Sequence, residues 1–280
     1  MKLKKPKIDP LNLTVENVYK NRPRRWIFNL ALVLFFLVLI IYSWSTLGID
    51  VKDRDFMKSL VVMAKGFANP NVDFLLGRGD FAGESGVPYL ILQTIAIAFV
   101  GTLIGAILAV PFGFLTARNV VGKYSKIGEI LLIIIRTFPE ILLALVLVRF
   151  SGTGAFTGTM AVGIHSIGMI GKLYAESIEN IDPGPIEALD ACGSNTFTRI
   201  SKAIMPQVFP DFMSTVLYRF DINIRTATVL GVVAAGGIGA PMTFAISGWY
   251  WSDLSSILIA IIIMVVVVDI VSSLLRKKLL

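Results

Sequence analysis

The sequence contains a single histidine, His165, and a single cysteine, Cys192. One residue of each type does not make the clustered His and Cys ligand sets of zinc sites, so no metal site is expected. A lone cysteine also excludes an internal disulfide bond. Charged residues are scarce as well, at 16% of 280 residues, whereas soluble domains carry about 25%. These shortages disfavour a metalloenzyme, a disulfide-stabilised domain and a soluble globular protein.

Hydrophobic residues replace the missing charge: they make up 55% of the chain, and the mean hydropathy is +0.75. They gather in blocks about 20 residues long, enough for a helix to cross a bilayer core about 30 Å thick. The blocks predict an all-α, polytopic membrane protein with six transmembrane helices. These helices are expected at about 26–48, 88–117, 127–150, 155–174, 212–241 and 254–275.

Polar segments complete the predicted organisation. Residues 1–25 form a basic cytoplasmic tail, and residues 49–87 form an extracytoplasmic connection. Within that connection, apolar residues repeat at helical spacing and predict a short amphipathic helix on the outer membrane surface. These apolar residues are Phe56, Leu60, Val61, Ala64 and Phe67. The rest of the chain, 88–280, is a transmembrane core interrupted by a polar loop at 182–210.

The net charge of +7 gathers at the expected membrane edges. Eight basic residues precede the first apolar block, three follow the last, and three lie in the short loop at 118–126. Because Lys and Arg accumulate on the cytoplasmic side, both termini and the polar loop at 182–210 are expected in the cytoplasm. No basic stripe with interleaved aromatic residues is present, so nucleic-acid binding is not expected.

The polar loop centres on Glu187–Pro206, with the sequence EALDACGSNTFTRISKAIMP. Its first half is typical of a short helix, with Asp182 as a candidate N-cap. Gly193 is expected to end that helix in a turn. A second helical piece, Phe197–Met205, is expected to end at Pro206, because proline lacks the N–H that would continue the hydrogen-bond ladder. A helix–turn–helix between two membrane spans is placed to contact a partner outside the membrane.

Ionisable side chains within the predicted spans are unfavourable in lipid, so they are usually paired or functional. Arg136–Glu140 and Asp221–Arg225 are spaced i,i+4, so each pair could neutralise itself on one helix face. Arg219 and Asn223 fall on a different face from the second pair, because two residues advance a helix by about 200°. Structural pairing and a role in lining a path remain equal alternatives, and packing is favoured for the lone histidine. The path candidates are Arg136, Glu140, His165, Arg219, Asp221, Asn223 and Arg225.

Four glycines follow these charges, at Gly231, Gly236, Gly237 and Gly239. Small residues let helix backbones approach closely in a membrane. A bend that acts as a gate is the other interpretation, and close packing is favoured.

Motifs of known enzymes are incomplete. Gly122–Lys123 is similar to part of a phosphate-binding loop, but Ala117 stands at its first glycine position and Tyr124 replaces the Ser or Thr. The chain is therefore expected to hold no ATP site of its own. Ser247–Gly248 and Gly77–Asp80 match fragments of intramembrane protease motifs without their partner residues. No internal repeat is present, which favours a subunit that pairs with a second copy.

Glu187–Ala188, Gly193 and Pro206 have the spacing of the EAA loop of ABC-importer permeases, which the polar loop therefore resembles. Arg136–Glu140 and Arg219–Gly231 narrow the resemblance to permeases of phosphonate importers. It covers most of residues 85–275. The departures from the family pattern keep a small or apolar character and are Leu189, Ala203, Met205 and Ala234.

This resemblance implies a type I ABC-importer permease fold and a transport subunit, not an enzyme. It implies uptake of phosphonate or a related phosphorus oxyanion, such as phosphate or phosphite, across the inner membrane of a bacterium. The implied partners are a second copy in a homodimer, two ATP-binding cassette subunits and an extracytoplasmic substrate-binding protein. ATP and Mg²⁺ would sit on the ATPase subunits, so this chain is expected to carry no cofactor. The implied coupling residues are Glu187, Ala188, Asp190, Gly193, Ile200, Ile204 and Pro206.

Other transport classes remain open at the level of the sequence. One is an ABC-importer permease for another small solute, and the other is a stand-alone carrier or channel. An intramembrane enzyme is disfavoured by the incomplete motifs. In importers of this kind the binding protein does most of the selecting, so the sequence leaves the identity of the oxyanion open.

Overall fold

The computed structural model describes residues 25–46, 56–78 and 86–279. The chain divides into two compact units, 1–59 and 60–280. The residues in the three described ranges form helices and short connections, without a strand. The predicted all-α class is therefore confirmed.

The first unit contains α2 (Arg25–Thr46), the helix expected at 26–48. Its described side chains are exposed on every side, and its sequence is apolar all round. A helix of this kind requires an apolar environment such as lipid. The predicted basic tail lies outside the described residues, apart from Arg25.

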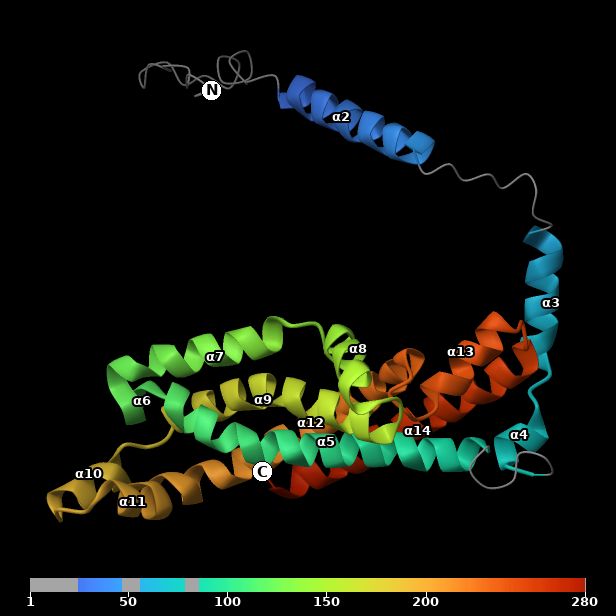
Figure 1. The fold of residues 1–280 in the computed structure, drawn as a ribbon. Coiled ribbons are helices and arrows are strands. Elements are labelled where there is room, and N and C mark those ends of the chain that lie inside the picture. The colour runs from blue at the N-terminus through green and yellow to red at the C-terminus, as the bar shows by residue number, and fades with distance from the viewer. Residues whose placement is uncertain (1–24, 47–55, 79–85, 280) are drawn as a thin grey trace, which may run out of the picture. The chain divides into compact units, whose positions relative to one another are not determined.

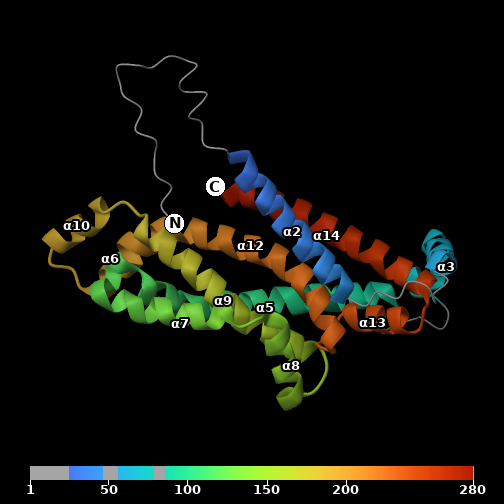
Figure 2. The same cartoon turned by 90° about the horizontal axis from the view of Figure 1, so that it is seen from above.

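The second unit is built on α5 (Val87–Thr116), α9 (Ala155–Glu179), α12 (Met205–Leu230) and α14 (Trp251–Leu279). The first three pack against one another, and α14 packs on α12 and α5 (Figure 1). Glycine permits the close approach of α5 and α9, because a Cβ on Gly101 would lie only 2.8 Å from Cγ1 of Val162. Figure 2 shows α5, α9, α12 and α14 from a second direction.

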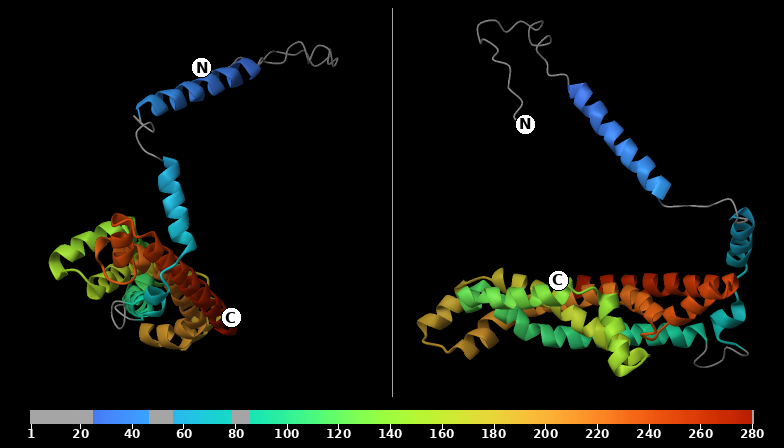
Figure 3. Two further views of the ribbon diagram at one scale, coloured as in Figure 1. Left: turned by 90° about the vertical axis from the view of Figure 1, so that its right-hand side faces the viewer. Right: turned by 45° about the horizontal axis from the view of Figure 1, so that its top comes forward.

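Shorter helices cap and connect the long ones. They are α3 (Phe56–Ala68), α4 (Val72–Leu76), α6 (Arg118–Val121), η3 (Gly122–Tyr124), α7 (Ser125–Thr137), α8 (Glu140–Ser151), α10 (Gly184–Ala191), α11 (Thr196–Thr198), η4 (Arg199–Ile204), η5 (Gly231–Val233) and α13 (Gly239–Ser247). The hairpin formed by α10, α11 and η4 extends beyond one end of the long helices, and α4 and α13 lie at the other end (Figure 3). The two ends of the unit are thus built differently.

The helix expected within 49–87 corresponds to α3. Its last turn packs on the start of α14, where the rings of Phe67 and Trp251 lie 6.2 Å apart. The α4 helix follows, and the side chain of its N-cap residue, Asn71, donates a hydrogen bond of 2.8 Å to Asp253. This part of the predicted outer connection is therefore attached to the helical core.

Three described helices are long and apolar enough to cross a membrane: Phe28–Thr46, Val87–Thr116 and Trp251–Lys278. A fourth span is formed if the bent pair Arg118–Thr137 and Glu140–Ser151 is counted as one. The predicted span 155–174 falls on α9, which is long but more polar. The predicted span 212–241 is not one helix: α12 ends at Leu230, and the rest lies in η5, a turn and the start of α13. The six-helix count therefore remains a prediction, although the multi-pass character is clear.

The prediction of one continuous span at 127–150 is wrong. The chain bends by 80° between α7 and α8. Phe138 is extended at φ −74° and ψ 120°, and Pro139 follows it before α8 begins at Glu140. Proline disfavours helical geometry in the residue before it and supplies no N–H to the helix. These two effects together break the span.

The prediction that the loop helix ends at Pro206 is also wrong. Pro206 lies in the first turn of α12, which then continues to Leu230. Proline is tolerated there because the first N–H groups of a helix have no intrahelical acceptor. The six residues directly before α12 are η4, and they form a π-helix. The helix at the expected fifth span, α12, therefore begins directly at the polar loop, seven residues before the expected position 212.

Candidate functional site

A buried ion cluster joins α8, α9 and α12. The Nη2 atom of Arg219 lies 3.8 Å from Oε2 of Glu140, and Nε2 of His165 lies 3.8 Å from the same oxygen. The side chain of Arg219 is 5% exposed and that of Glu140 is 11% exposed. His165 and Arg219 both approach Glu140, the first residue of α8 after the break. The cluster thus ties the start of α8 to the two long helices.

A second layer of hydrogen bonds lies beside the ion cluster. The amide of Asn223 donates to Oγ1 of Thr102 at 2.7 Å and to Oγ of Ser166 at 2.9 Å. Nε of Arg219 donates to the same Ser166 oxygen at 3.4 Å. Asn223, Thr102 and Ser166 are all fully or almost fully buried. This polar layer connects α5, α9 and α12, and Thr102 and Ser166 in it were not predicted from the sequence.

The predicted pairing of Arg136 with Glu140 is wrong. Glu140 contacts Arg219 and His165 instead. The i,i+4 spacing requires a continuous helix, and the chain breaks between these two residues. Arg136 is in α7, and its backbone packs against α9 at Gly168. A Cβ added to Gly168 would lie 3.0 Å from the backbone nitrogen of Arg136.

The predicted pairing of Asp221 with Arg225 is confirmed, because Nη2 of Arg225 donates to Oδ2 of Asp221. The expected separation of faces is also present on α12. Arg219 and Asn223 are both buried and share the contact with Ser166. Arg225 points away from them, with a side chain that is 56% exposed.

Four polar atoms of the buried cluster have no hydrogen-bond partner within the described ranges. They are Oε1 of Glu140, Nδ1 of His165, Nη2 of Arg219 and Oδ1 of Asn223. Buried polar atoms in folded proteins are nearly always hydrogen-bonded. The cluster therefore holds unused donors and acceptors, which ordered water or a shifted arrangement of the helices would satisfy. No group of three or more metal-binding side chains occurs in the described part of the chain.

An open hollow of about 370 Å³ lies next to the cluster. It is lined by Pro139, Glu140, Ile141, Arg225, Thr226 and Val229. The wall therefore consists of the start of α8 and the outer half of α12, and it carries both a carboxylate and a guanidinium.

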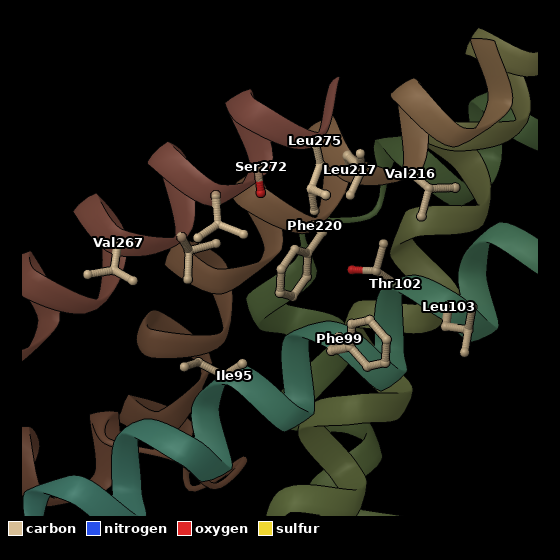
Figure 4. A pocket seen from close by; sticks show the side chains of 12 residues that line it. Ile95, Phe99, Thr102, Leu103, Val216, Leu217, Phe220, Val267, Ser272 and Leu275 are labelled. Carbon is tan, nitrogen blue, oxygen red and sulfur yellow. The ribbon is translucent and has the colours of Figure 1, made fainter. Parts of the chain in front are cut away.

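A second hollow, of about 270 Å³, lies between α5, α12 and α14. Figure 4 shows that Phe99 and Phe220 face it together with aliphatic side chains. The hydroxyl of Thr102 lies at its edge, and this oxygen already accepts the hydrogen bond from Asn223. The lining is apolar and offers no charge to an ion, so the hollow beside Glu140 and Arg225 is the better candidate for a polar solute.

Arg225 lies well inside the expected bilayer core. Its neighbours Ile224 and Ala227 pack in one cluster with Ile97 of α5 and Met264 of α14. These two residues are about 15 Å and about 20 Å along their helices from the N-terminal ends. An arginine at the centre of a lipid-facing helix is unfavourable by about 2.5–3.5 kcal/mol on insertion scales. On this ground its half-exposed side chain is expected to face water or protein, not lipid.

The polar loop forms the helical hairpin that extends from the bundle. Gly193 makes the turn with φ +71°, a left-handed conformation that favours glycine. Asn195 caps α11 by accepting a 2.8 Å hydrogen bond from the backbone N–H of Thr198. Asp190 and Arg199 form an ion pair of 3.1 Å across the turn. Asp182 accepts a 3.0 Å hydrogen bond from the N–H of Gly184 at the start of α10, although Pro183 occupies the N-cap position.

Most of the predicted coupling residues are exposed. They are Glu187, Ala188, Asp190, Gly193 and Pro206. Ile204 is different, because it is buried in the chain's own core with Tyr174, Val208 and Phe212, and Ile200 packs partly against the same cluster. The prediction that these two isoleucines are free to dock into a partner is therefore wrong for Ile204 and weakened for Ile200.

Phe197 is the apolar side chain that the sequence interpretation missed. It follows the capping residues of α11 and is 78% exposed. An exposed phenylalanine among polar loop residues is a typical anchor of a protein–protein interface. The signal in the sequence is an aromatic residue one position after a helix start, where no core requires it.

The glycines after α12 lie in a tight connection. A Cβ on Gly231 would lie 2.6 Å from Cα of Gly239, and a Cβ on Gly239 would lie 2.1 Å from the carbonyl oxygen of Thr228. Gly236 and Gly237 adopt φ values of +83° and +75°. The N–H of Gly237 donates to the side chain of Gln93 at 2.9 Å. These distances show close packing between η5, α13 and α5.

Comparisons with known proteins agree with this architecture. The family described as binding-protein-dependent transport system inner membrane component matches residues 109–279. The phosphite transport system permease protein PtxC of Stutzerimonas stutzeri is 35% identical over 213 residues, which cover 74% of this chain and 78% of that protein. The phosphate-import permease protein PhnE of Mycolicibacterium smegmatis is 38% identical over 189 residues, which cover 67% of this chain and 36% of that protein.

A structure of the MetNI methionine ABC transporter in inward-facing conformations shares the fold. Its TM-score is 0.61 at 18% sequence identity, and the match covers 68% of this chain and 94% of that chain. The matched family consists of transport components, so the chain is a transport component and not an enzyme. The chain belongs to the family of inner membrane components of binding-protein-dependent transport systems.

Proposed function

We propose that this chain is the membrane-spanning subunit of an ATP-driven importer for phosphonate or a related phosphorus oxyanion, such as phosphate or phosphite. The observation that carries this proposal is the guanidinium of Arg225, which is more than half exposed and lines a hollow beside the buried ion cluster. Guanidinium groups match the geometry of phosphate-type oxyanions. The names of the relatives, a phosphite permease and a phosphate-import permease, point to the same class of substrate.

The transport path would run along the face of α8 and α12 that carries the hollow. Arg136, Asp221 and Arg225 would supply charge along this route, while Glu140, His165, Arg219 and Asn223 would hold the helices that form it. The glycines Gly231, Gly236, Gly237 and Gly239 would keep the outer connection closely packed, which supports the path from outside. A route of this kind needs charge that passes the ion on without trapping it.

ATP hydrolysis would take place on two partner ATPase subunits, which would hold ATP and Mg²⁺. The hairpin would contact these subunits through exposed residues, including Glu187, Asp190 and Phe197. The hairpin continues directly into α12, so a movement of the docked hairpin would reach the helix that carries Arg225. Two copies of this chain would form a homodimer, with an extracytoplasmic binding protein on the outer side and both termini in the cytoplasm.

Reconstitution tests this function directly. The chain would be co-purified with its ATPase, placed in liposomes and supplied with the binding protein and labelled phosphite, phosphate or methylphosphonate. ATP-dependent uptake of at least one of these anions is the expected result. Uptake without the ATPase would indicate a stand-alone carrier, and uptake of an unrelated solute alone would reject the oxyanion class.

A further inference from the structure

The two arginines of α12, Arg219 and Arg225, differ in their exposure to solvent. Arg219 is 5% exposed, lies 3.8 Å from Glu140, and donates to Ser166. It does not line the open hollow. Arg225 is 56% exposed and does line it. A solute that reaches this face therefore meets Arg225 first.

The guanidinium of Arg225 has one occupied edge and one open edge. Among the described residues, its Nη2 atom donates to Asp221, and its Nη1 and Nε atoms have no partner. A guanidinium carries five N–H donors in a planar fork, so several donors remain for a ligand. Because Arg225 lines the hollow, these donors belong to a side chain that borders it.

The hollow is large enough for a small hydrated anion. Its volume is about 370 Å³, and a water molecule in the liquid occupies about 30 Å³. The apolar part of its wall, formed by Pro139, Ile141 and Val229, offers no competing hydrogen bonds. Arg225 is thus the one cationic side chain among the six residues that line this hollow.

Asp221 limits how strongly Arg225 can hold an anion. The carboxylate neutralises much of the guanidinium charge and fixes its orientation. It is itself buried, with a side chain that is 9% exposed, so it competes with the anion without blocking access to it. An anion on the open edge would therefore be bound and released readily, as a transport path requires.

We infer that Arg225 is the residue that contacts the phosphorus oxyanion inside the membrane, and that Asp221 is a positioning residue that sets how long the anion stays. Arg219, in contrast, holds α8 through Glu140 and makes no contact with the anion. This inference rests on the proposed function and names the contact within its path.

The test is ATP-dependent uptake by the complete complex in liposomes, measured over a range of binding-protein-loaded phosphite or phosphate concentrations. Arg225→Gln removes a charge-assisted contact, so KM should rise roughly 10- to 100-fold. Arg225→Lys keeps the charge but loses the planar fork, so its KM should lie between those of the wild type and Arg225→Gln. Asp221→Asn removes the competing charge, so KM should fall and maximal uptake should fall with it, because release becomes slower.

The matched control is Lys172→Gln. Lys172 forms an i,i+4 ion pair of 3.5 Å with Glu176 on α9, and it lines neither hollow described above. Its KM should be unchanged. Assembly of each variant is measured by co-purification with the ATPase, and Arg225→Lys decides the result if the glutamine variant does not assemble.

A wild-type KM in both Arg225 variants would overturn the inference. An Asp221→Asn variant would also overturn it if its KM and maximal uptake fell by no more than those of Lys172→Gln. Failure of the wild-type complex to import any phosphorus oxyanion, despite active ATPase, would instead reject the proposed function. The two failures are thus distinguishable.

Discussion

The ion pair between Arg219 and Glu140 should be the most sensitive electrostatic contact of the described core. The two charged atoms lie 3.8 Å apart, and both side chains are nearly buried. At an effective dielectric constant of about 20, Coulomb's law gives an attraction of about 4 kcal/mol at this separation. Glu140→Gln would leave the guanidinium of Arg219 buried without its counter-charge, a change that usually destabilises a protein by about 3–5 kcal/mol.

A double-mutant cycle measures this coupling. The free energy of unfolding in detergent would be determined by circular dichroism for the wild type, Glu140→Gln, Arg219→Gln and the double variant. We expect each single variant to be destabilised and the double variant to be less destabilised than the sum of the two. A coupling energy of at least about 2 kcal/mol is expected for residues in contact.

The control cycle uses Lys172 and Glu176, a pair of similar length whose side chains are 36% and 50% exposed. Water screens such a pair, so its coupling should be no more than about 1 kcal/mol. If the effects of Glu140→Gln and Arg219→Gln add to within about 0.5 kcal/mol, the buried pair does not stabilise the break between α7 and α8. The reasoning from distance and burial would then be refuted.

Three further predictions concern other parts of the chain. Phe197→Ala should weaken co-purification with the ATPase by roughly tenfold or more, because an aromatic anchor buried at an interface contributes about 1.5–3 kcal/mol. Lys202→Ala, which changes another exposed residue of the hairpin, should have little effect. Equal co-purification of the two variants with the ATPase would contradict the role of Phe197 as an anchor. Gly239→Ala should destabilise the chain by about 1–3 kcal/mol, because the new Cβ would lie 2.1 Å from the Thr228 oxygen; an unchanged thermal midpoint would contradict this packing. Asn223→Leu should destabilise the chain by a similar amount, because it leaves the hydroxyls of Thr102 and Ser166 without their amide donor; unfolding measurements that match the wild type would show that this polar layer is dispensable.

Several features follow from the sequence because they depend on neighbours along one helix or on composition. The scarcity of charge and the apolar blocks indicate a helical membrane protein whatever the packing. Asp221 and Arg225 meet because four residues bring two side chains together on a helix. Gly193 forms the turn because it adopts a positive φ at little steric expense. The helical hairpin was likewise predictable from its spacing.

Other features depend on contacts between helices that are distant in sequence. The spacing predicted that Glu140 pairs with Arg136. The break at Pro139 and the packing of α9 and α12 instead place Glu140 beside His165 and Arg219. The hydrogen bonds of Asn223 to Thr102 and Ser166 join residues more than 50 positions apart, so no local pattern indicates them.

The sequence by itself determined the class of protein, the hairpin and the ion pair on one helix, since these depend on composition and local periodicity. The tertiary structure decided which arginine is buried and which is exposed, and which isoleucine of the hairpin is used by its own core. The physical reason is that helical spacing determines which side chains share a face, while the packing of neighbouring helices determines which face meets protein and which stays exposed.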